Sequence, residues 1–155
     1  MSDYDSTQDT LDHISKVQGY MADMIAKLQA RAATHDASKL QSPEKAIFDE
    51  WTPKLRAMTY GSDEYKAGLA AMGEGLQHHY RHNSHHPEHY PGGVTDMSLL
   101  DLVEMLCDWY AATQRHADGD MTKSIYTNCR RFEIERQLGV ILANTAEDMG
   151  WIDHR

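Results

Sequence analysis

The sequence of 155 residues predicts an all-α protein that forms a single helical bundle. Apolar residues recur at spacings of three and four along most of the chain, which is typical of helices with one buried face. No segment has the convincing alternation of apolar and polar residues that strands show. Capping residues, prolines and glycines separate the periodic segments. We therefore expect one helical domain over residues 10–150, with a disordered acidic tail at 1–9 and a C-terminal tail at 151–155.

The first helix is expected to start at Thr10 and to reach Ala32 or beyond. Its apolar stripe consists of Leu11, Ile14, Val17, Met21, Met24, Ile25 and Leu28. A short second helix follows Ser42-Pro43-Glu44, where serine can cap, proline needs no amide hydrogen and glutamate suits the positive helix end. Pro53 is expected to disturb this helix.

The third helix is expected to follow a cap at Ser62 or Asp63. One stripe along it carries Tyr65, Leu69, Met72, Leu76 and His79. Prolines and glycines make residues 84–94 a loop. Thr95 or Asp96 then caps a helix that is apolar nearly all round, so we expect that helix to be central and buried.

Two further helices complete the expected bundle. The first runs from about Met121 to Arg131, and the last carries Ile134, Leu138, Ile141, Leu142 and Met149 on its apolar side. Both cysteines, Cys107 and Cys129, fall in helical apolar patterns, so we expect small buried hydrophobic residues rather than a disulfide or a thiolate metal site. Any metal would then be held by nitrogen and oxygen ligands.

The charge balance narrows the classes of function. With 24 acidic residues against 15 basic ones, the net charge of −9 repels polyanions, so a nucleic-acid polymer is not an expected partner. No apolar run approaches the roughly 20 residues that span a bilayer, and the acidic start lacks the basic region of a signal peptide. We therefore expect a cytoplasmic protein that does not bind membranes. The Met-rich apolar faces and the last helix permit a homodimer.

Six of the ten histidines lie within residues 78–89. His79 continues an apolar stripe, and His82 and His86 follow it at helical spacing, so all three face inward if the helix persists. Neutral imidazole is a common nitrogen ligand for zinc, iron, manganese, cobalt and nickel, which makes this cluster the raw material of a metal site. The alternative is a solvated polar loop with one core histidine.

Three carboxylates stand on the apolar helix, at Asp101, Glu104 and Asp108. A buried carboxylate must become neutral, pair with a cation or bind a metal, because desolvation of an unpaired charge is costly. The three carboxylates are therefore consistent both with a metal site and with salt bridges to the nearby arginines at positions 115, 130 and 131.

The order of these features resembles the HD superfamily of metal-dependent phosphohydrolases: His13, then His35-Asp36, then a histidine-rich segment, then Asp108, all on helices. By itself His35-Asp36 also suits a polar helix end with its aspartate near a cap. More closely, six strings over about residues 10–146 are similar to a family of small, uncharacterised bacterial and phage proteins of HD type. The strings are His35-Asp-Ala-Ser-Lys-Leu, Ser42-Pro-Glu-Lys, Tyr60-Gly-Ser-Asp-Glu-Tyr-Lys, His78-His-Tyr, His85-His-Pro-Glu-His-Tyr and Asp101-Leu-Val-Glu-Met-Leu-Cys-Asp-Trp.

This resemblance implies a helical bundle that binds one or two divalent ions (Mn, Fe, Co, Ni, Zn or Mg). On that basis the first ligands are His13, His35, Asp36 and Asp108, and His79 with His85 or His86 completes a second position. The implied activity is hydrolysis of a small phosphate ester, such as a nucleotide, by metal-activated water.

One position departs from the single-metal nucleotidases of HD type, because Lys39 stands where they commonly carry a glutamate. Lysine can bind a phosphate but is a poor base at neutral pH, so Glu44, Glu88 or Glu104 would have to move the proton. The expected catalytic residues are thus Asp36, Glu104 and Lys39. The expected phosphate contacts are Lys39, Arg81 and Arg115, although each also suits an ordinary surface charge.

Two other functions use the same residues. A di-iron oxygenase of HD type would take the same histidines and carboxylates as ligands. A catalytically silent bundle that binds a metal or a partner is favoured by Lys39.

Overall fold

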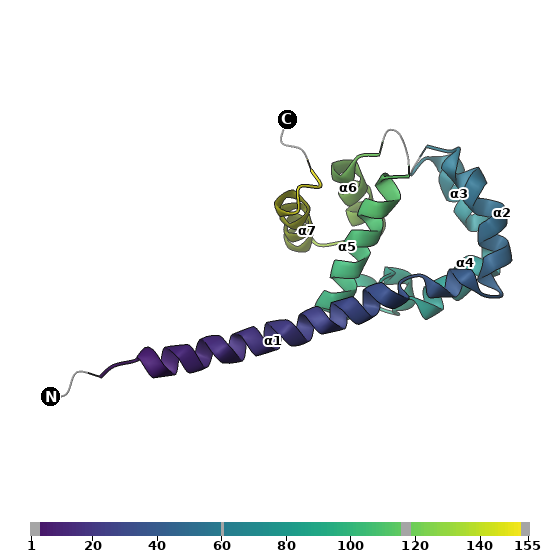
Figure 1. Cartoon of the computed structure of the whole chain (residues 1–155). Coiled ribbons are helices and arrows are strands. Elements are labelled where there is room, and N and C mark those ends of the chain that lie inside the picture. The colour runs from purple at the N-terminus through teal and green to yellow at the C-terminus, as the bar shows by residue number, and fades with distance from the viewer. Residues whose placement is uncertain (1–3, 60, 116–118, 153–155) are drawn as a thin grey trace. The chain divides into compact units, whose positions relative to one another are not determined.

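A computed structural model describes residues 4–59, 61–115 and 119–152, and the prediction of an all-α protein is confirmed over them (Figure 1). The described helices are α1 (Thr7–Thr34), η1 (Ala37–Leu40), α2 (Glu44–Arg56), α3 (Asp63–Ala71), α4 (Gly73–His82), η2 (Pro87–His89), η3 (Gly93–Asp96), α5 (Leu99–Thr113), α6 (Met121–Arg131) and α7 (Arg136–Asp148), where η marks a short 3₁₀ helix. Among the described residues, none of the helices combines the length and the hydropathy that crossing a membrane requires.

The chain divides into two units, Met1–His35 and Asp36–Arg155. The first unit is essentially α1, which begins at Thr7, three residues before the expected Thr10. The acidic residues of the expected tail explain the early start: the Asp5 carboxylate accepts hydrogen bonds from the Thr7 amide at 2.9 Å and from its hydroxyl at 2.6 Å. An acceptor at this end satisfies amides that have no partner inside the helix. Of the expected tail, residues 1–3 lie outside the described part.

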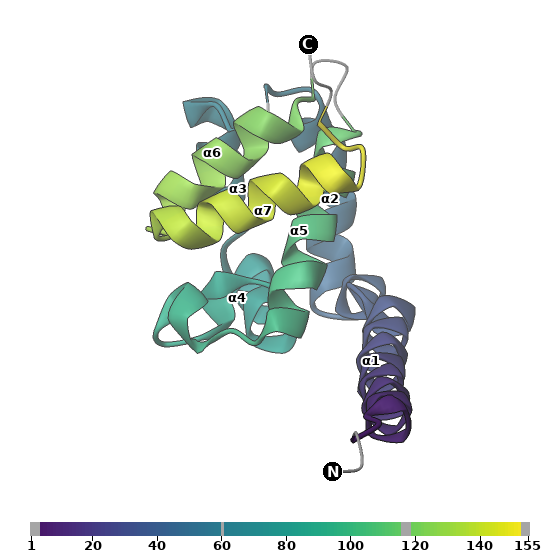
Figure 2. The ribbon, with the colours of Figure 1, turned by 90° about the vertical axis from the view of Figure 1, so that its left-hand side faces the viewer.

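In the second unit, α5 packs against α6 and α6 packs against α7, while α2 packs against α3, α4 and η1. Figure 2 shows α6 and α7 side by side. The buried apolar core comes from α5, α6 and α7 and consists of Met105, Leu106, Trp109, Met121, Ile125, Leu142 and Ala146. Trp151 and Ile152 pack against this core, so the domain extends past the expected boundary at 150; residues 153–155 lie outside the described part.

Two helix boundaries differ from the prediction. The single helix expected after Ser62 is broken between α3 and α4 at Gly73, whose φ of +50° is a left-handed conformation that glycine adopts without steric cost. Conversely, α2 continues through Pro53 to Arg56. Because Pro53 and Asp49 are both exposed, water can satisfy the Asp49 carbonyl that the proline leaves without an amide donor.

The helix α5 is buried on one face only. Leu99 is 61 % exposed and Val103 is 36 % exposed, so the expectation of a helix buried all round was wrong. Cys107 is exposed on the same helix, also against expectation, whereas Cys129 is half-buried.

The cap of α5 is Ser98 rather than Thr95 or Asp96. The Ser98 hydroxyl accepts a hydrogen bond from the Asp101 amide at 3.2 Å, and the Asp101 carboxylate accepts one from the Ser98 amide at 2.9 Å. This reciprocal pair is a capping box.

Asp101 is buried, and two more hydroxyl groups donate to its carboxylate: Ser84 at 2.7 Å and Tyr90 at 3.0 Å. Burial raises the pKa of Asp101, but the hydrogen bonds from Ser98, Ser84 and Tyr90 outweigh that effect and hold the pKa well below its usual range. Hydroxyl and amide donors therefore stabilise this charge.

Replacing Asp101 with alanine should lower the free energy of unfolding by about 1–3 kcal/mol, because Ser84 and Tyr90 lose a buried acceptor and α5 loses its cap. Since folding lowers this pKa, the stabilisation is present above the unfolded value of about 3.9 and is lost as the pH falls through the folded value. Urea titrations at pH 7 measure the effect. Asp148→Asn, at an exposed position on α7, is the control, and equal midpoints for the two variants would contradict the prediction.

Candidate metal centre

Four side chains of the second unit converge on one point: Asp36, His79, His85 and His86. Each offers a nitrogen or oxygen atom, and these four atoms all lie within 4.8 Å of one another. Asp36 immediately precedes η1, His79 is on α4, and His85 and His86 follow α4 in the chain. The residues are named the His₃Asp cluster below.

The separations within the His₃Asp cluster match those of ligands around one ion. The Asp36 Oδ1 atom lies 3.3 Å from His79 Nε2 and 3.5 Å from His85 Nε2. The Nε2 atoms of His79 and His86 are 2.9 Å apart. Ligands placed roughly 2.0–2.1 Å from a shared metal ion are themselves roughly 2.9–3.4 Å apart in octahedral or tetrahedral geometry. The cluster is therefore of a size that a single metal ion can bridge.

The backbone at Asp36 turns its side chain into the cluster. Its φ of +56° lies in the left-handed region, which aspartate tolerates better than most residues. The two carboxylate oxygens then have different neighbours, because Oδ2 accepts a hydrogen bond from Lys39 Nζ at 2.5 Å while Oδ1 faces the imidazoles. Lys39 Nζ also lies 4.9 Å from the centre of the Phe48 ring.

Behind His79 lies Glu44, whose side chain is completely buried. Its carboxylate accepts hydrogen bonds from His79 Nδ1 at 2.9 Å, His78 Nδ1 at 2.7 Å and the Ser38 hydroxyl at 2.9 Å. Burial raises the pKa of Glu44, but the three donors together leave it below its usual value. The Asn83 amide donates to the Ser38 hydroxyl and to the His79 carbonyl, both at 2.8 Å, and so ties this network to α4.

His85 has the same kind of support. Its Nδ1 lies 3.0 Å from the Glu104 carboxylate on α5. With Nδ1–H directed to a carboxylate, the ring presents its Nε2 lone pair to the centre, which is the arrangement that orients histidine ligands in metal sites. His79, held by Glu44, presents its Nε2 in the same way.

Two imidazoles of the cluster are held in their neutral, ligating form. Burial and the positive charge of Lys39 lower the pKa of His79. Burial and the neighbouring His85 and His79 lower the pKa of His86 to about 2. Neutral rings do not repel a cation at the centre of the cluster, and the Asp36 carboxylate attracts one.

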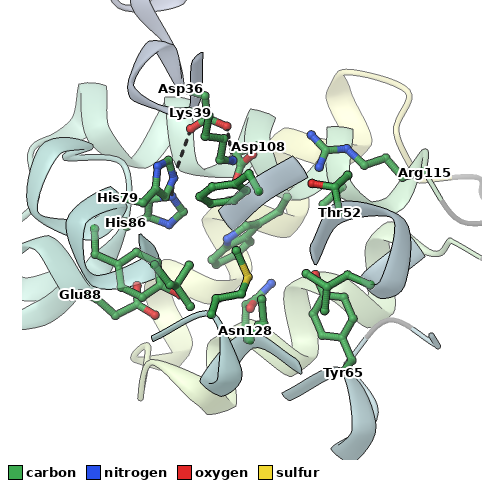
Figure 3. A pocket seen from close by; sticks show the side chains of 18 of the residues that line it. Asp36, Lys39, Thr52, Tyr65, His79, His86, Glu88, Asp108, Arg115 and Asn128 are labelled. Atoms are coloured by element: carbon green, nitrogen blue, oxygen red, sulfur yellow. Dashed lines mark hydrogen bonds and ion pairs between the residues drawn. The ribbon is translucent and has the colours of Figure 1, made fainter. Parts of the chain in front are cut away.

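The cluster forms part of the wall of a cavity of about 650 Å³ within the second unit. Figure 3 shows Asp36 and His79 together on one side of this cavity, with Asn128 and Tyr65 on the opposite side. Lys39 and Arg115 also line it and bring positive charge, so the cavity can admit an anion beside the cluster.

Of the predicted metal ligands, the structure brings together Asp36, His79, His85 and His86. Asp108 lies at the edge of this set, since one of its carboxylate oxygens is within 4.8 Å of a His85 ring nitrogen and the residue lines the cavity. His35 is at the C-cap of α1, the last residue of the first unit, and its role as a ligand stays a prediction.

The prediction that His13 and His35 bind one ion was wrong. The helix α1 is continuous between them, and 22 residues at a rise of about 1.5 Å separate the two side chains by about 33 Å. His82 does not turn inward either; it is exposed, and its Nδ1 hydrogen-bonds the His78 carbonyl one turn earlier.

The predicted catalytic and phosphate-binding residues have separate outcomes. Lys39 and Arg115 line the cavity, and their contact with a phosphate stays a prediction. Arg81 does not line it: this arginine is exposed and lies 3.6 Å from the exposed Glu74. Glu104 is held against His85, which indicates a positioning role rather than direct contact with a substrate.

Sequence reasoning missed the part that Glu44 has in the site. It interpreted Glu44 as a favourable charge at the helix start and as one of three candidates for proton transfer, whereas the residue is the buried acceptor for three donors. Ser38 and Asn83, which complete this network, carry no sequence signal beyond their short polar side chains. The adjacent His78 and His79, whose Nδ1 atoms both reach Glu44, were the one available hint of a buried carboxylate.

Fold and site together define a class: an all-helical protein with a buried cluster of three histidines and an aspartate, able to hold a metal ion, at the wall of a cavity. The chain belongs to the family of unknown function DUF5662, which matches residues 2–149. Neither a curated protein nor a solved structure matches the chain.

Proposed function

We propose that the His₃Asp cluster binds a divalent metal ion and that the protein hydrolyses a small phosphate ester, such as a nucleotide, in the adjoining cavity. One observation carries the proposal: the Nε2 atoms of His79 and His85 lie at ligand spacing from the Asp36 Oδ1 atom, and the Nε2 atom of His86 lies at ligand spacing from that of His79. The resemblance of His35-Asp36 and its neighbours to the HD superfamily supports the same reaction class.

The ligand chemistry favours some metals over others. Three imidazoles with one carboxylate suit manganese, iron, cobalt, nickel or zinc, whereas magnesium prefers ligands that are all oxygen. A divalent ion in such a site lowers the pKa of a bound water molecule and polarises phosphoryl oxygens. One ion accounts for the four ligands.

The residues of the cavity divide the remaining tasks. Arg115 lines the cavity with Lys39, and both can attract the phosphate group as point charges or hydrogen-bond donors. Lys39 also holds the outer oxygen of Asp36, so it keeps Oδ1 directed at the imidazoles. Asp108 lines the cavity near His85 and is the carboxylate placed to accept a proton beside the cluster. The volume of about 650 Å³ falls within the range of pockets for molecules of nucleotide size.

Purified without a nickel resin, the full chain should contain about one divalent ion per molecule by mass spectrometry, the stoichiometry of a single four-ligand site. Chelator should lower its melting temperature, because a metal that binds only the native state stabilises that state. With manganese, cobalt or nickel added, nucleoside monophosphates or triphosphates should release inorganic phosphate. The chelated protein is the control in the same assay.

Three other outcomes would contradict all or part of the proposal. A protein without metal, whose melting temperature is unchanged by chelator, would overturn the whole proposal. Two irons per chain, an oxygen-dependent spectral change and no phosphate release would point to the di-iron oxygenase instead. A metal-loaded protein that is inert across the substrate panel would be a binding bundle, and the hydrolytic part of the proposal would fall.

A further inference from the structure

The cavity contains a buried polar group that takes no part in the metal centre, the side-chain amide of Asn128 on α6. Asn128 lines the cavity and is only 4 % exposed. Among the described residues its side chain has one hydrogen-bond partner, the Ser124 hydroxyl, to which Nδ2 donates over a long distance of 3.4 Å. Buried amides normally use both their carbonyl oxygen and their amino group. The Asn128 amide can therefore bind a polar edge of a molecule in the cavity.

The wall beside Asn128 is aromatic. The Phe132 amide donates to the Asn128 backbone carbonyl at 2.9 Å, so the two residues are one turn apart at the end of α6. The Phe132 ring is nearly parallel to that of Trp109 on α5, with an angle of 8° and a distance of 6.3 Å between the ring centres. Both residues line the cavity. Asn128, Trp109 and Phe132 are named the Asn128 wall below.

The charge next to this wall is compensated within the protein. The Arg131 guanidinium lies 4.7 Å from the centre of the Phe132 ring, and it forms an ion pair with Glu88 at 2.7 Å. Figure 3 shows Asn128 on the side of the cavity opposite to Asp36. One side of the cavity therefore suits an anion beside a metal ion, and the other suits a neutral, flat group that has a hydrogen-bonding edge.

We propose that the Asn128 wall binds the base of a nucleoside phosphate whose phosphate group lies at the His₃Asp cluster. This binding mode rests on the proposed function, and it narrows the substrate to nucleotides. The Asn128 amide presents an N–H donor and a C=O acceptor side by side, and each common nucleobase has an edge with the complementary pair. Aromatic side chains such as those of Trp109 and Phe132 stack on the faces of bases.

Other phosphate esters match the Asn128 wall less well. A sugar phosphate has no flat ring to stack on Trp109 or Phe132 and no base edge to pair with the Asn128 amide. An inorganic polyphosphate would bring charge against the two aromatic rings, where its desolvation is costly. A nucleoside phosphate instead carries its charge and its flat ring at opposite ends, which is how the cavity is arranged.

The first experiment measures nucleoside binding, which requires neither metal nor hydrolysis. Adenosine, guanosine, cytidine and uridine are titrated into the full chain up to millimolar concentration, and saturation transfer in NMR detects binding through the base protons. At least one nucleoside should bind, and Asn128→Leu should weaken that binding at least about 10-fold, because two hydrogen bonds are lost. Asn144→Leu, at an exposed position on α7, is the matched control and should leave binding unchanged. Circular dichroism shows whether each variant is folded.

A second variant tests the hydrogen-bond pattern itself. Asn128→Asp keeps the shape of the side chain but replaces its donor with a second acceptor. Guanine has two adjacent donors on one edge, whereas adenine, cytosine and uracil do not. The ratio of guanosine affinity to adenosine affinity should therefore rise at least about 10-fold in Asn128→Asp protein. A variant that only loosens the fold would weaken both nucleosides alike, so an unchanged ratio would overturn the contact between Asn128 and the base.

The second experiment compares phosphate release from nucleoside monophosphates and from ribose phosphate, with manganese, cobalt or nickel present. The preferred nucleotide should have a kcat/KM at least about 10-fold higher than ribose phosphate, because its base stacks on the wall. Asn128→Leu should reduce this preference and leave release from ribose phosphate unchanged.

The outcomes separate this binding mode from the proposed hydrolysis. Equal kcat/KM values for nucleotides and ribose phosphate would overturn base binding at the Asn128 wall, while the hydrolysis stands. Nucleoside binding that depends on Asn128, without phosphate release from any substrate, would support base binding and overturn the hydrolysis. Failure of all four nucleosides to bind the natural chain would overturn base binding.

Discussion

Replacing Asp36 with asparagine should abolish metal binding and, with it, phosphate release. The Asp36 Oδ1 atom is the oxygen that faces both His79 Nε2 at 3.3 Å and His85 Nε2 at 3.5 Å. Asparagine keeps the size of the side chain and tolerates the left-handed backbone at this position, but it removes the negative charge that balances a divalent ion. Mutation of a residue that only orients a metal ligand typically costs 10–100-fold in metal affinity, so loss of this ligand itself should cost at least roughly 100-fold.

Metal content after dialysis and the rate of phosphate release measure this effect. Asp49→Asn is a matched control, because Asp49 also lines the cavity but forms an exposed ion pair with Lys45 at 2.5 Å. The control should keep its metal and most of its activity. Undiminished metal in Asp36→Asn protein would remove the His₃Asp cluster as the binding site, whereas loss of metal with unchanged phosphate release would separate hydrolysis from the metal.

The helices could be predicted wherever one local signal dominated. The bounds of α6 were predicted as Met121 to Arg131 and are found there, because its apolar period is uninterrupted and Asp120 caps it through the Lys123 amide. The break at Gly73 could not be predicted, since an isolated glycine weakens a helix without deciding whether the chain turns. Similarly, the cap of α5 was predicted at Thr95 or Asp96 and lies at Ser98, because Ser98 forms the reciprocal pair with Asp101.

The candidate site shows where local patterns stop being informative. His79, His85, His86 and Asp36 could be named from their residue types and from the family resemblance, yet the grouping of ligands was wrong, because His13 was expected to share an ion with His35. A continuous helix keeps residues in its first turns far from those at its end, whatever chemistry they share. The second unit instead brings α4 and the segment after it to Asp36 through tertiary packing, which no spacing along the sequence encodes.

The residues that hold the ligands in place are also brought together by tertiary packing. This explains why two glutamates on one helix differ in their contribution to stability, although the sequence around them gives no sign of it. Glu44 and Glu50 lie on the same helix, less than two turns apart. Glu44 is fully buried and accepts from three side chains, whereas Glu50 is 61 % exposed and pairs with Lys54, one turn further along the same helix, at 2.7 Å. Whether a glutamate is buried in a hydrogen-bond network or exposed to solvent is therefore visible only in the folded chain.

Replacing Glu44 with alanine should therefore cause a large loss of stability. It would leave His78, His79 and Ser38 without their buried acceptor, and breaking a buried charge network of this kind costs about 3–5 kcal/mol. For a chain of this size that corresponds to a fall in melting temperature of roughly 6–20 °C. The measurement is made in chelator, so that loss of bound metal does not contribute. Glu50→Ala is the control on the same helix and should change stability by less than about 0.5 kcal/mol.

The pH dependence of this difference tests its cause. Folding lowers the pKa of Glu44, so the carboxylate stabilises the native state above its unfolded pKa of about 4.3, and that stabilisation is lost as the pH falls through the lower, folded value. The gap in unfolding free energy between the natural chain and Glu44→Ala should therefore be widest near neutral pH and should narrow below about pH 4. A gap that stays constant into acid would mean that Glu44 acts through its packing volume alone. A gap no larger than that of Glu50→Ala would mean that the buried network does not hold His79 in place.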